Sequence, residues 1–409
     1  MGTKCRDCEE QLTEVLVDLG MSPLCQKHVL VSELNHVEQF YPLKAWVCVH
    51  CWLVQLEEYV EPDELFTQYE YFSSYSTSWV EHARQYVEMI TGRLGLSRSS
   101  QVVEIASNDG YLLQHFVEKK IPCVGIEPAA NVAATAKEKG IECIVKFFGK
   151  RTAQETLQTH GKADLILGNN VLAHVPDLHD FVSGLKHLLG TDGVVTMEFP
   201  HLDRLIQENQ FDTIYHEHFS YFSFFVVERV FAKHGLRLFD VEEIPTHGGS
   251  LRIYACHSDA KNYPTTKAVD GLRKREIDAG YASMDVYAEF TSKVMATKRK
   301  LLEFLIGVKE EGKTIVGYGA PGKGNTLLNY CGIRTDFLDY TVDRSPIKQG
   351  TFTPGTHIPI LDPSEIARTK PDFVLILPWN LHKEISESAS FIGDWGGKFV
   401  VPIPEVRVL

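Results

Sequence analysis

Four consecutive residues, Tyr215-His216-Glu217-His218, combine a phenol, two imidazoles and a carboxylate. They lie within the aromatic segment FDTIYHEHFSYFS, and a loop that faces water rarely carries so many aromatic side chains. Burial in an apolar pocket shifts the pKa values of His and Glu, and side chains perturbed in this way can exchange protons with a substrate near neutrality. The run is therefore a candidate site of general acid–base catalysis.

Two cysteine pairs near the start of the chain have the spacing of metal ligands. Both pairs are Cys-x-x-Cys, and their members are Cys5, Cys8, Cys48 and Cys51. Four thiolates in two such pairs complete a tetrahedral shell around Zn²⁺, so we predict a structural zinc ion. Cys25, His28 and His50 are alternative ligands, although each alone is more typical of a packed or surface residue. The first 65 or so residues show little periodicity, and metal is expected to replace a core there.

The composition bounds the classes of protein that this chain can represent. Its 409 residues, 44% of them hydrophobic, suffice for two or three domains with separate cores. The formal net charge of −13 argues against a nucleic-acid partner. Nine cysteines, an odd number, do not suggest a disulfide framework, and no apolar run has the length of a membrane span. We expect a cytoplasmic protein without a membrane partner, either a monomer or a small homo-oligomer.

The middle of the chain alternates between strand-like and helix-like segments. Strands are predicted for β-branched runs, and helices for the stretches between them, such as 110–119 and 129–139. The predicted strands are 101–106, 122–126, 141–145, DLILGNN, VVTMEFP (194–200) and LRIYAC (251–256). This alternation predicts parallel strands joined by crossover helices, and hence a doubly wound sheet.

The first of these strands leads into the turn and helix of VVEIASNDGYLL. Backbone amides at such a helix N-terminus can bind a carboxylate or phosphate, and an acidic residue ending the second strand can bind ribose hydroxyls. The segment lacks GxGxxG, which disfavours a dinucleotide. We therefore predict S-adenosylmethionine, with another nucleotide as the alternative. The predicted contacts are Glu104, Ala106, Asn108, Gly110, Glu127, Pro128, Phe148 (or Phe147) and Asn169.

Together these motifs resemble a known family, the zinc-containing, S-adenosylmethionine-dependent sugar C-methyltransferases that act on nucleotide-linked 4-keto deoxysugars. The matching segments run in order along nearly the whole chain: CRDC, CVHC, SSYSTSWVEHA, EIASNDGYLL, GIEPAANVA, NNVLAHVPDL, FDTIYHEHFSYFS, HGGSLRIY and GYGAPGKGNTLLNY. The resemblance implies an α/β protein of three domains: a zinc-binding module (1–68), a Rossmann-like methyltransferase domain (69–258), and a C-terminal Rossmann-like domain (259–409) that helps to hold the nucleotide sugar.

The resemblance also implies a chemistry. A methyl group would be transferred to the carbon beside the ketone, C-3 of a dTDP-linked 4-keto-deoxysugar, in the biosynthesis of deoxysugars and of antibiotics that carry them. That carbon must first lose a proton, and His218 is the candidate base. Glu217 would orient an imidazole or bind a substrate hydroxyl or amine, while Tyr215 and His174 would bond the keto oxygen or its neighbour. His216, or a deprotonated Tyr215, is an alternative base.

A second glycine-rich motif lies near the C-terminus. Residues 317–322 fit G-x-G-x-x-G after the predicted strand KTIV, and Asp343 ends the next strand. Alone, this pattern predicts an NAD site. Pro321 in the turn and Lys323 after it favour the diphosphate of a nucleotide sugar instead; a structural remnant of a duplicated Rossmann unit is the alternative. The residues predicted to bind substrate are Tyr69, His247, Gly249, Tyr318, Lys323, Asn325, Asp343 and Trp379.

The sequence leaves three classes of function open. The leading hypothesis is a sugar C-methyltransferase. The second is an NAD-dependent oxidoreductase that acts on a nucleotide sugar through the C-terminal motif. The third is a non-enzymatic zinc-ribbon binding module, which would need a basic face.

Overall fold

The computed structural model describes residues 3–67 and 72–409, and the chain folds into two compact units. Unit 1 consists of Met1–Leu12, Cys48–Leu202 and Glu217–Ser283. Unit 2 consists of Thr13–Val47, Asp203–His216 and Met284–Leu409. The chain passes from unit 2 to unit 1 between His216 and Glu217, inside the run of candidate catalytic residues.

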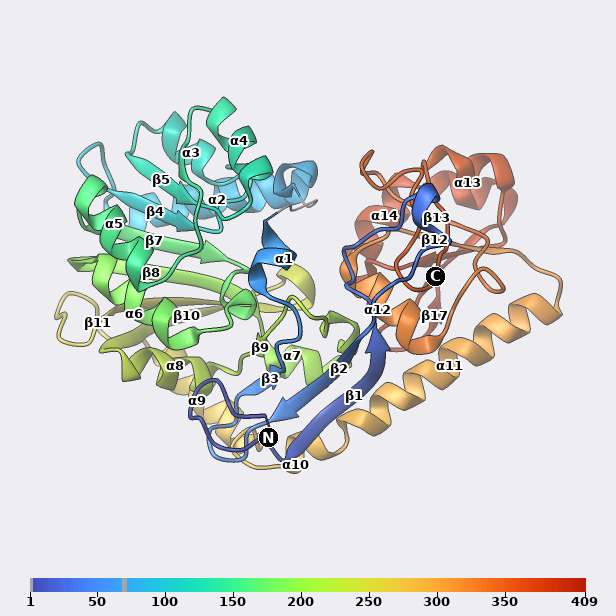
Figure 1. Cartoon of the computed structure of the whole chain (residues 1–409), viewed down its shortest axis with the longest axis horizontal. Helices are drawn as coiled ribbons and strands as arrows, with labels where there is room; N and C mark the ends of the chain where they lie inside the picture. The colour runs from blue at the N-terminus through green and yellow to red at the C-terminus, as the bar shows by residue number, and fades with distance from the viewer. Residues whose placement is uncertain (1–2, 68–71) are drawn as a thin grey trace. The chain divides into compact units, whose positions relative to one another are not determined.

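Unit 1 is built on a seven-stranded sheet with the order β10-β11-β8-β7-β4-β5-β6 (Figure 1). The strands β6, β5, β4, β7 and β8 are parallel, whereas β11 and β10 are added antiparallel. Their bounds are β4 Val102–Ile105, β5 Cys123–Ile126, β6 Glu142–Ile144, β7 Ala163–Asn169, β8 Leu189–Pro200, β10 Leu236–Ile244 and β11 Ser250–His257. The predicted closing strand 251–256 lies in β11; its partner β10 was not predicted.

Helices connect these strands. They are α1 Pro62–Phe66, α2 Thr77–Leu94, α3 Leu113–Glu118, α4 Ala130–Glu138, α5 Lys150–His160, α6 Leu178–Leu188, α8 Phe224–Lys233 and α9 Lys267–Asp278. Helix α2 begins where the Ser76 hydroxyl accepts a hydrogen bond from the Trp79 amide, and it ends at Gly95 in the left-handed conformation. Its apolar face packs into the core that covers the sheet.

The strand order of this sheet reverses beside β4. From β4 the chain continues outwards through β5 and β6 on one side, and through β7 and β8 on the other. Ligands of such sheets bind outside the carboxyl ends of the strands at this switch point. The turn 106–110, Glu127 and Asn169 all lie there, because they end or follow β4, β5 and β7. The predicted doubly wound sheet is confirmed.

Unit 2 contains a six-stranded sheet with the order β14-β13-β12-β15-β16-β17. All neighbours are parallel except β17, which is antiparallel to β16. The strands are β12 Ile315–Tyr318, β13 Thr341–Val342, β14 Ile360–Leu361, β15 Phe373–Ile376, β16 Lys398–Val401 and β17 Arg407–Val408. In chain order this is 3-2-1-4-5-6, the order of dinucleotide-binding folds. The predicted Rossmann-like C-terminal part is therefore confirmed.

The helices of unit 2 surround this sheet or extend from it (Figure 1). They are α7 Leu202–Gln207, whose first residue belongs to unit 1, α10 Asp285–Ala288, α11 Phe290–Glu310, α12 Gly322–Cys331, α13 Ser364–Thr369 and α14 His382–Ser388.

The N-terminal residues contain more regular structure than their sequence indicates. Strands β1 (Glu14–Ser22) and β2 (Tyr41–Val47) form an antiparallel hairpin in unit 2, and alternate residues of β2 are buried. In unit 1, β3 (Val54–Leu56) pairs antiparallel with β9 (Ser220–Tyr221). The two units thus group the chain differently from the three predicted domains, whose boundaries at 68 and 258 remain predictions.

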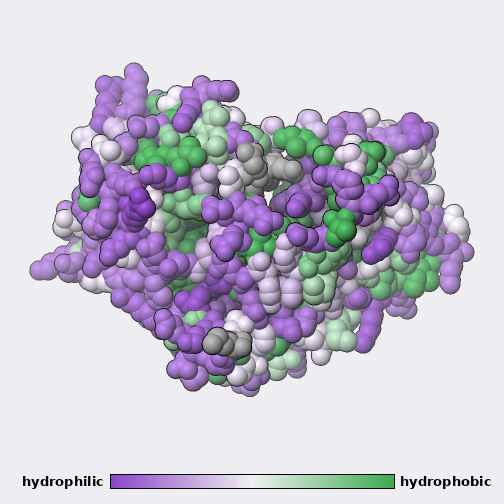
Figure 2. All heavy atoms as spheres, in the orientation of Figure 1, coloured by the Kyte–Doolittle hydropathy of each residue, from purple (hydrophilic) through white to green (hydrophobic). Residues whose placement is uncertain are grey.

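Hydrophilic side chains predominate on the face of the molecule drawn in Figure 2, with smaller hydrophobic areas between them. Within the ranges 3–67 and 72–409, none of the helices combines the length and the apolar composition needed to cross a lipid bilayer.

The turn after β4 depends on Gly110, which provides the first test. Its φ is +74°, and a Cβ there would lie 2.3 Å from Ile141 Cδ1. Gly110→Ala should lower the free energy of unfolding by about 3 kcal/mol, because left-handed strain and overpacking add. Gly95→Ala has the same strain (φ +64°) with nothing within 4 Å, so it should cost only about 1–2 kcal/mol. If urea denaturation showed equal losses of unfolding free energy in the two variants, a destabilising contact between the new Cβ and Ile141 would be excluded.

Candidate active site

The turn that follows β4 is formed by residues in unusual backbone conformations. Ala106, Asn108 and Gly110 have φ values of 56°, 50° and 74°, a region that non-glycine residues rarely adopt. The Asn108 side chain accepts a hydrogen bond of 2.9 Å from the Ser73 amide, which tethers the segment before α2 to the turn. Strain of this kind persists where surrounding contacts enforce it, as at ligand sites.

Glu127, directly after β5, joins the two strand ends. Its carboxylate accepts hydrogen bonds of 2.9 Å from the amides of Asn108 and Ala129. Burial raises the pKa of this carboxyl, although the two backbone hydrogen bonds oppose the shift. Pro128 follows it and is partly exposed. The residue predicted to bind ribose hydroxyls thus lies beside the turn predicted to bind the rest of the donor.

Glu104 is a buried carboxylate whose oxygens lack hydrogen-bond partners among the described residues. Burial raises its pKa well above the usual range, and Glu127 and Asp109 add to the shift. A buried polar group without a partner is costly, so a cationic ligand group would relieve this cost. The Asn169 amide nitrogen at the end of β7 is also buried without a partner in the described structure. The ammonium group of S-adenosylmethionine fits this pocket.

The two phenylalanines predicted near adenine differ in exposure. Phe147 is 40% exposed. Phe148 is partly buried and packs edge-on against Phe181 of α6, with 5.3 Å between the ring centroids. Their contact with a donor stays a prediction.

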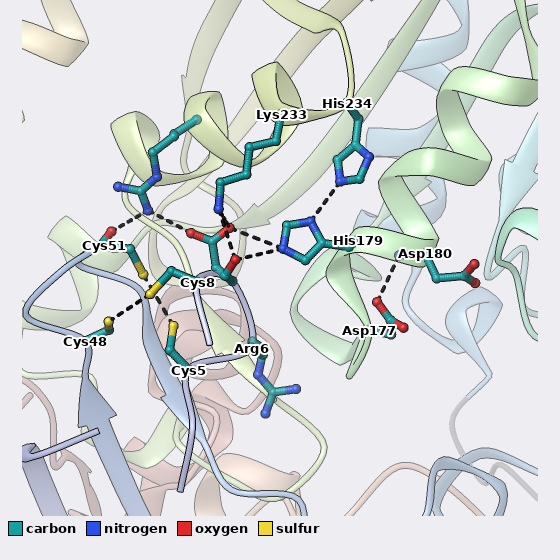
Figure 3. A network of polar contacts seen from close by, with 12 residues as sticks. Cys5, Arg6, Cys8, Cys48, Cys51, Asp177, His179, Asp180, Lys233 and His234 are labelled. Atoms are coloured by element: carbon teal, nitrogen blue, oxygen red, sulfur yellow. Dashed lines mark hydrogen bonds and ion pairs between the residues drawn. The ribbon is translucent and has the colours of Figure 1, made fainter. Parts of the chain in front are cut away.

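The four predicted zinc ligands converge. The sulfur atoms of Cys5, Cys8, Cys48 and Cys51 all lie within 4.8 Å of one another. The Cys5–Cys51 and Cys8–Cys48 sulfur pairs are 3.4 and 3.5 Å apart (Figure 3). Four sulfur donors in one cluster fit the tetrahedral shell of a structural Zn²⁺ ion.

Charged side chains fasten this cysteine cluster to the methyl-donor unit (Figure 3). Asp7 is buried and pairs with Lys233 at 2.6 Å and Arg229 at 3.1 Å, both on α8. His179 of α6 lies 2.8 Å from the Asp7 carbonyl oxygen. The zinc-binding residues are thus anchored to two helices that pack on the seven-stranded sheet.

Two predicted catalytic residues from distant parts of the chain meet in unit 1. The rings of His174 and His218 contact edge-on, with centroids 4.7 Å apart and planes at 72°. The Phe219 amide donates a hydrogen bond of 2.8 Å to the Ala173 carbonyl, joining the residues next to the two histidines. His218 and Glu217 are 7% and 4% exposed. The structure therefore combines imidazole and carboxylate groups in a largely dry environment.

His174 is held as a neutral imidazole. Burial lowers its pKa to about 4, although a backbone hydrogen bond with Glu217 opposes the shift. The Phe66 ring packs edge-on against it at 5.5 Å, and its Nδ1 is buried without a hydrogen-bond partner in the described parts of the chain. A neutral imidazole that donates through one nitrogen keeps a lone pair on the other, so Nδ1 can accept a hydrogen bond from a substrate hydroxyl. The role of His174 in binding substrate stays a prediction.

The other half of the run belongs to unit 2. His216 Nε2 lies 3.2 Å from the Pro42 carbonyl oxygen of β2, and its ring contacts Tyr41 edge-on at 5.8 Å. Burial lowers the pKa of His216. Its other ring nitrogen, Nδ1, is buried without a partner in the described structure, so the role of His216 as the alternative base stays a prediction. Tyr215 is partly exposed, and its role stays a prediction.

The predicted substrate loop around His247 contacts the residue that follows β7, at the carboxyl end of the parallel strands of unit 1. His247 has a φ of 55°, and its Nε2 lies 2.9 Å from the side-chain nitrogen of Asn170, which follows β7. Gly249 has a φ of 113°. The Trp79 ring contacts His247 edge-on at 4.9 Å, a neighbour that sequence reasoning missed. Tyr69 lies outside the described residues.

The glycine-rich turn of unit 2 uses its predicted ligand-binding groups internally. The Asp343 carboxylate accepts hydrogen bonds from the amides of Ala320 (2.8 Å) and Ser345 (2.9 Å). In dinucleotide sites an acidic residue at this place binds the ribose hydroxyls, and Asp343, like Glu127, keeps lone pairs that could do so. Asn325 is fully buried and donates to the Cys25 carbonyl at 2.7 Å, while its side-chain oxygen has no partner among the described residues. Contact of Asp343 and Asn325 with substrate stays a prediction.

Lys323 forms a buried cluster at the start of α12. Its ammonium donates to the Asn380 side chain at 2.9 Å and lies 4.8 Å from the centroid of the Trp379 ring. The Trp379 indole donates to Asp212 at 2.7 Å. Burial lowers the pKa of Lys323 and raises that of Asp212 to about 6, while each charge opposes the shift of the other. Asp212 was missed, although it lies three residues before Tyr215. Tyr318 is buried in β12.

The fold and the two sites define the chain as a methyltransferase with a zinc-binding module, and family comparisons agree. Residues 5–66 match the family described as "Putative zinc binding domain", 79–241 match "Methyltransferase domain", and 245–404 match "C-methyltransferase C-terminal domain". The C-methyltransferase NovU of Streptomyces niveus is 37% identical over 406 residues, covering 99% of this chain and 96% of that protein. The chain therefore belongs to the C-methyltransferase family. It is an enzyme that methylates carbon.

Two solved methyltransferase structures are similar to part of the chain. A methyltransferase from Clostridium acetobutylicum shares 12% identity with a TM-score of 0.36, covering 44% of this chain and 92% of that one. Magnesium protoporphyrin IX methyltransferase from Synechocystis, with bound S-adenosylhomocysteine, shares 13% identity with a TM-score of 0.35, covering 44% and 83%.

Replacing one zinc ligand tests the metal site. Cys48→Ser should reduce the zinc content from about one equivalent to near zero and lower the melting temperature, because metal binding contributes to folding. Cys123→Ser, a partly buried cysteine outside the cluster, should keep its zinc. Metal analysis and thermal melting provide the readouts. A Cys48→Ser protein that retained its zinc would show that the four-cysteine site is misassigned.

Replacing Glu104 tests the donor pocket. The raised pKa means that the folded, ligand-free protein binds more protons than the unfolded chain, so its stability falls as pH rises above the usual Glu range. Glu104→Gln should therefore melt at a higher temperature than the wild type at pH 8, with little difference at pH 4. Its affinity for S-adenosylhomocysteine should fall at least about 10-fold, because a charge-assisted hydrogen bond is lost.

Calorimetric titration and thermal melts measure both effects of this change. Glu138→Gln, on the exposed face of α4, is the control and should alter neither quantity. Unchanged affinity in Glu104→Gln would remove this carboxylate from the donor site.

Proposed function

We propose that this enzyme transfers a methyl group from S-adenosylmethionine to the carbon beside the ketone, C-3, of a dTDP-linked 4-keto-deoxysugar. Membership of the C-methyltransferase family supports transfer to carbon. The contact between His174 and His218 is the observation that carries the proposal. Carbon beside a ketone becomes nucleophilic only after losing a proton, and the pair offers a base together with a second ring nitrogen that can bond the substrate.

In this proposal His218 removes the α-proton. His218 is 7% exposed, so bulk water is largely excluded from its ring. The Nδ1 lone pair of neutral His174 accepts a hydrogen bond from the hydroxyl next to the ketone and orients the sugar. Glu217, next to His218, orients the imidazole or binds a substrate hydroxyl or amine. Tyr215 bonds the keto oxygen, where its phenol stabilises the enolate.

The methyl-donor pocket supplies the second reactant. S-adenosylmethionine, when bound, carries an electrophilic methyl group on its sulfonium. Glu104 would hold its ammonium group and Glu127 its ribose hydroxyls, both at the carboxyl edge of the parallel strands of unit 1. His174 follows β7 at this edge. His174, which contacts the proposed base His218, and the donor-binding residues thus lie at one switch point, where the sheet topology favours the approach of base and donor.

Lys323 is the proposed contact for the substrate diphosphate. It lies in the first turn of α12, where the helix N-terminus also favours anions. Its partners Asn380 and Asp212 keep the ammonium oriented in the absence of substrate. A diphosphate would be a stronger partner for this charge than the Asn380 amide.

His218→Gln is the first test of the chemistry. Turnover should fall about 10²–10⁴-fold, since a glutamine cannot accept the proton, whereas donor affinity should stay within about twofold of the wild type. His216→Gln, which loses a contact with β2, is the matched control and should retain most of the activity. Steady-state kinetics and donor titration separate the two effects. Near-normal turnover in His218→Gln would eliminate His218 as the base.

The substrate class is tested with a panel of 4-keto-6-deoxy nucleotide sugars and S-adenosylmethionine. The expected product gains one CH₂ in mass and shows a methyl resonance attached to ring carbon. A methyl group on oxygen or nitrogen, or no product from any member of the panel, would contradict the proposal.

A further inference from the structure

Arg6 lies between two of the zinc ligands in sequence, yet its side chain points away from the sulfur atoms (Figure 3). One guanidinium nitrogen donates to the Pro176 carbonyl at 2.8 Å, and another donates to the Leu56 carbonyl at 2.6 Å. The guanidinium carbon is 5.3 Å from the centroid of the Phe219 ring. A single side chain of the zinc knuckle therefore contacts three separate segments of unit 1.

Two of these segments carry the histidine pair. Pro176 lies two residues after His174, and Phe219 directly follows His218. The segments are already joined by the hydrogen bond between the Phe219 amide and the Ala173 carbonyl. Leu56, the third contact of Arg6, is also bonded to one of these segments, because its amide donates to the Phe219 carbonyl at 3.0 Å.

The zinc site holds the backbone of Arg6 in place. Its backbone amide donates to the Gln55 side chain at 2.9 Å, and the same side chain donates to the Cys5 sulfur at 3.1 Å. The backbone of Arg6 is thus held from both sides, by the flanking ligands and by Gln55. A guanidinium presents several donors in a rigid plane. Because the backbone of Arg6 is fixed, its guanidinium holds the carbonyl groups of Pro176 and Leu56 in fixed positions.

We propose that Arg6 is a positioning residue for methyl transfer, through which the zinc site sets the distance and angle between His174 and His218. The zinc ion would then serve the reaction through geometry rather than by contact with substrate. This inference rests on the proposed roles of the two histidines. It differs from a purely structural role for the knuckle, because the bonds from Asp7 to α8 already anchor the module.

Arg6→Gln is the test, with Arg229→Gln as the matched control. Arg229 also bonds the knuckle, at Asp7 and the Cys51 carbonyl, but none of its described contacts reaches the histidine segments. Both variants should keep their zinc. Arg6→Gln should lower kcat about 10²-fold, as expected for a small misplacement of reacting groups, with donor affinity unchanged. Arg229→Gln should lose stability and keep kcat.

Histidine NMR provides a readout that does not depend on turnover. In Arg6→Gln the His174 and His218 ring resonances, and the pH at which they titrate, should shift from those of the wild type. In Arg229→Gln they should not. Histidine resonances and a kcat in Arg6→Gln that match those of Arg229→Gln would overturn the inference.

A third variant covers the case in which Arg6→Gln does not fold. Arg6→Lys keeps the charge, but one ammonium cannot reproduce the planar fork, so kcat should still fall while the zinc content stays full. Wild-type kcat in Arg6→Lys would overturn the inference. Failure of the proposed function is a separate outcome, seen when the wild type itself methylates none of the keto sugars while the Arg6 variants still shift the histidine resonances.

Discussion

The edge-on contact between His174 and His218 is the interaction on which the proposed chemistry of this enzyme depends. Two imidazoles at 4.7 Å in a dry environment cannot both be charged without repulsion, and burial already holds His174 neutral by lowering its pKa to about 4. In the proposal, one ring bonds a substrate hydroxyl while the other accepts the proton from carbon. One imidazole then positions the sugar for the other, and the Tyr215 phenol stabilises the enolate as it forms.

The surrounding structure is arranged to hold that contact. The parallel sheet of unit 1 delivers His174 from the end of β7, beside the donor turn after β4. The segment of His218 is held by β9, which pairs with β3 of the zinc-binding region. Upstream of it, His216 is held within unit 2 by its contact with the Pro42 carbonyl of β2. The run of candidate catalytic residues is therefore restrained at His216 and again after His218, which limits the entropy that a flexible loop would lose on reaching the reactive geometry.

Short-range sequence patterns predicted which functional side chains this enzyme carries. They predicted less well which of these side chains meet in the folded chain. The two Cys-x-x-Cys pairs, the turn at Gly110 and Glu127 could be found because spacing along one segment determines their chemistry. The meeting of His174 with His218 depends on a backbone bond between Phe219 and Ala173, which no periodicity encodes. Arg6 resembles a solvated charge in the sequence. Asn325 and Asp343 fit a ligand motif, yet the Asn325 side-chain nitrogen and the Asp343 carboxylate also bond the backbone of this chain, a use that the motif does not indicate.

Exchange of the substrate α-proton tests the central claim most directly. The enzyme is incubated in deuterium oxide with a 4-keto-6-deoxy nucleotide sugar and S-adenosylhomocysteine, which fills the donor pocket but carries no transferable methyl group. Removal of the proton by a buried imidazole predicts that deuterium enters the carbon beside the ketone faster than in buffer, as seen by loss of its proton resonance. Exchange no faster than in buffer, with a sugar that the enzyme does methylate, would contradict it.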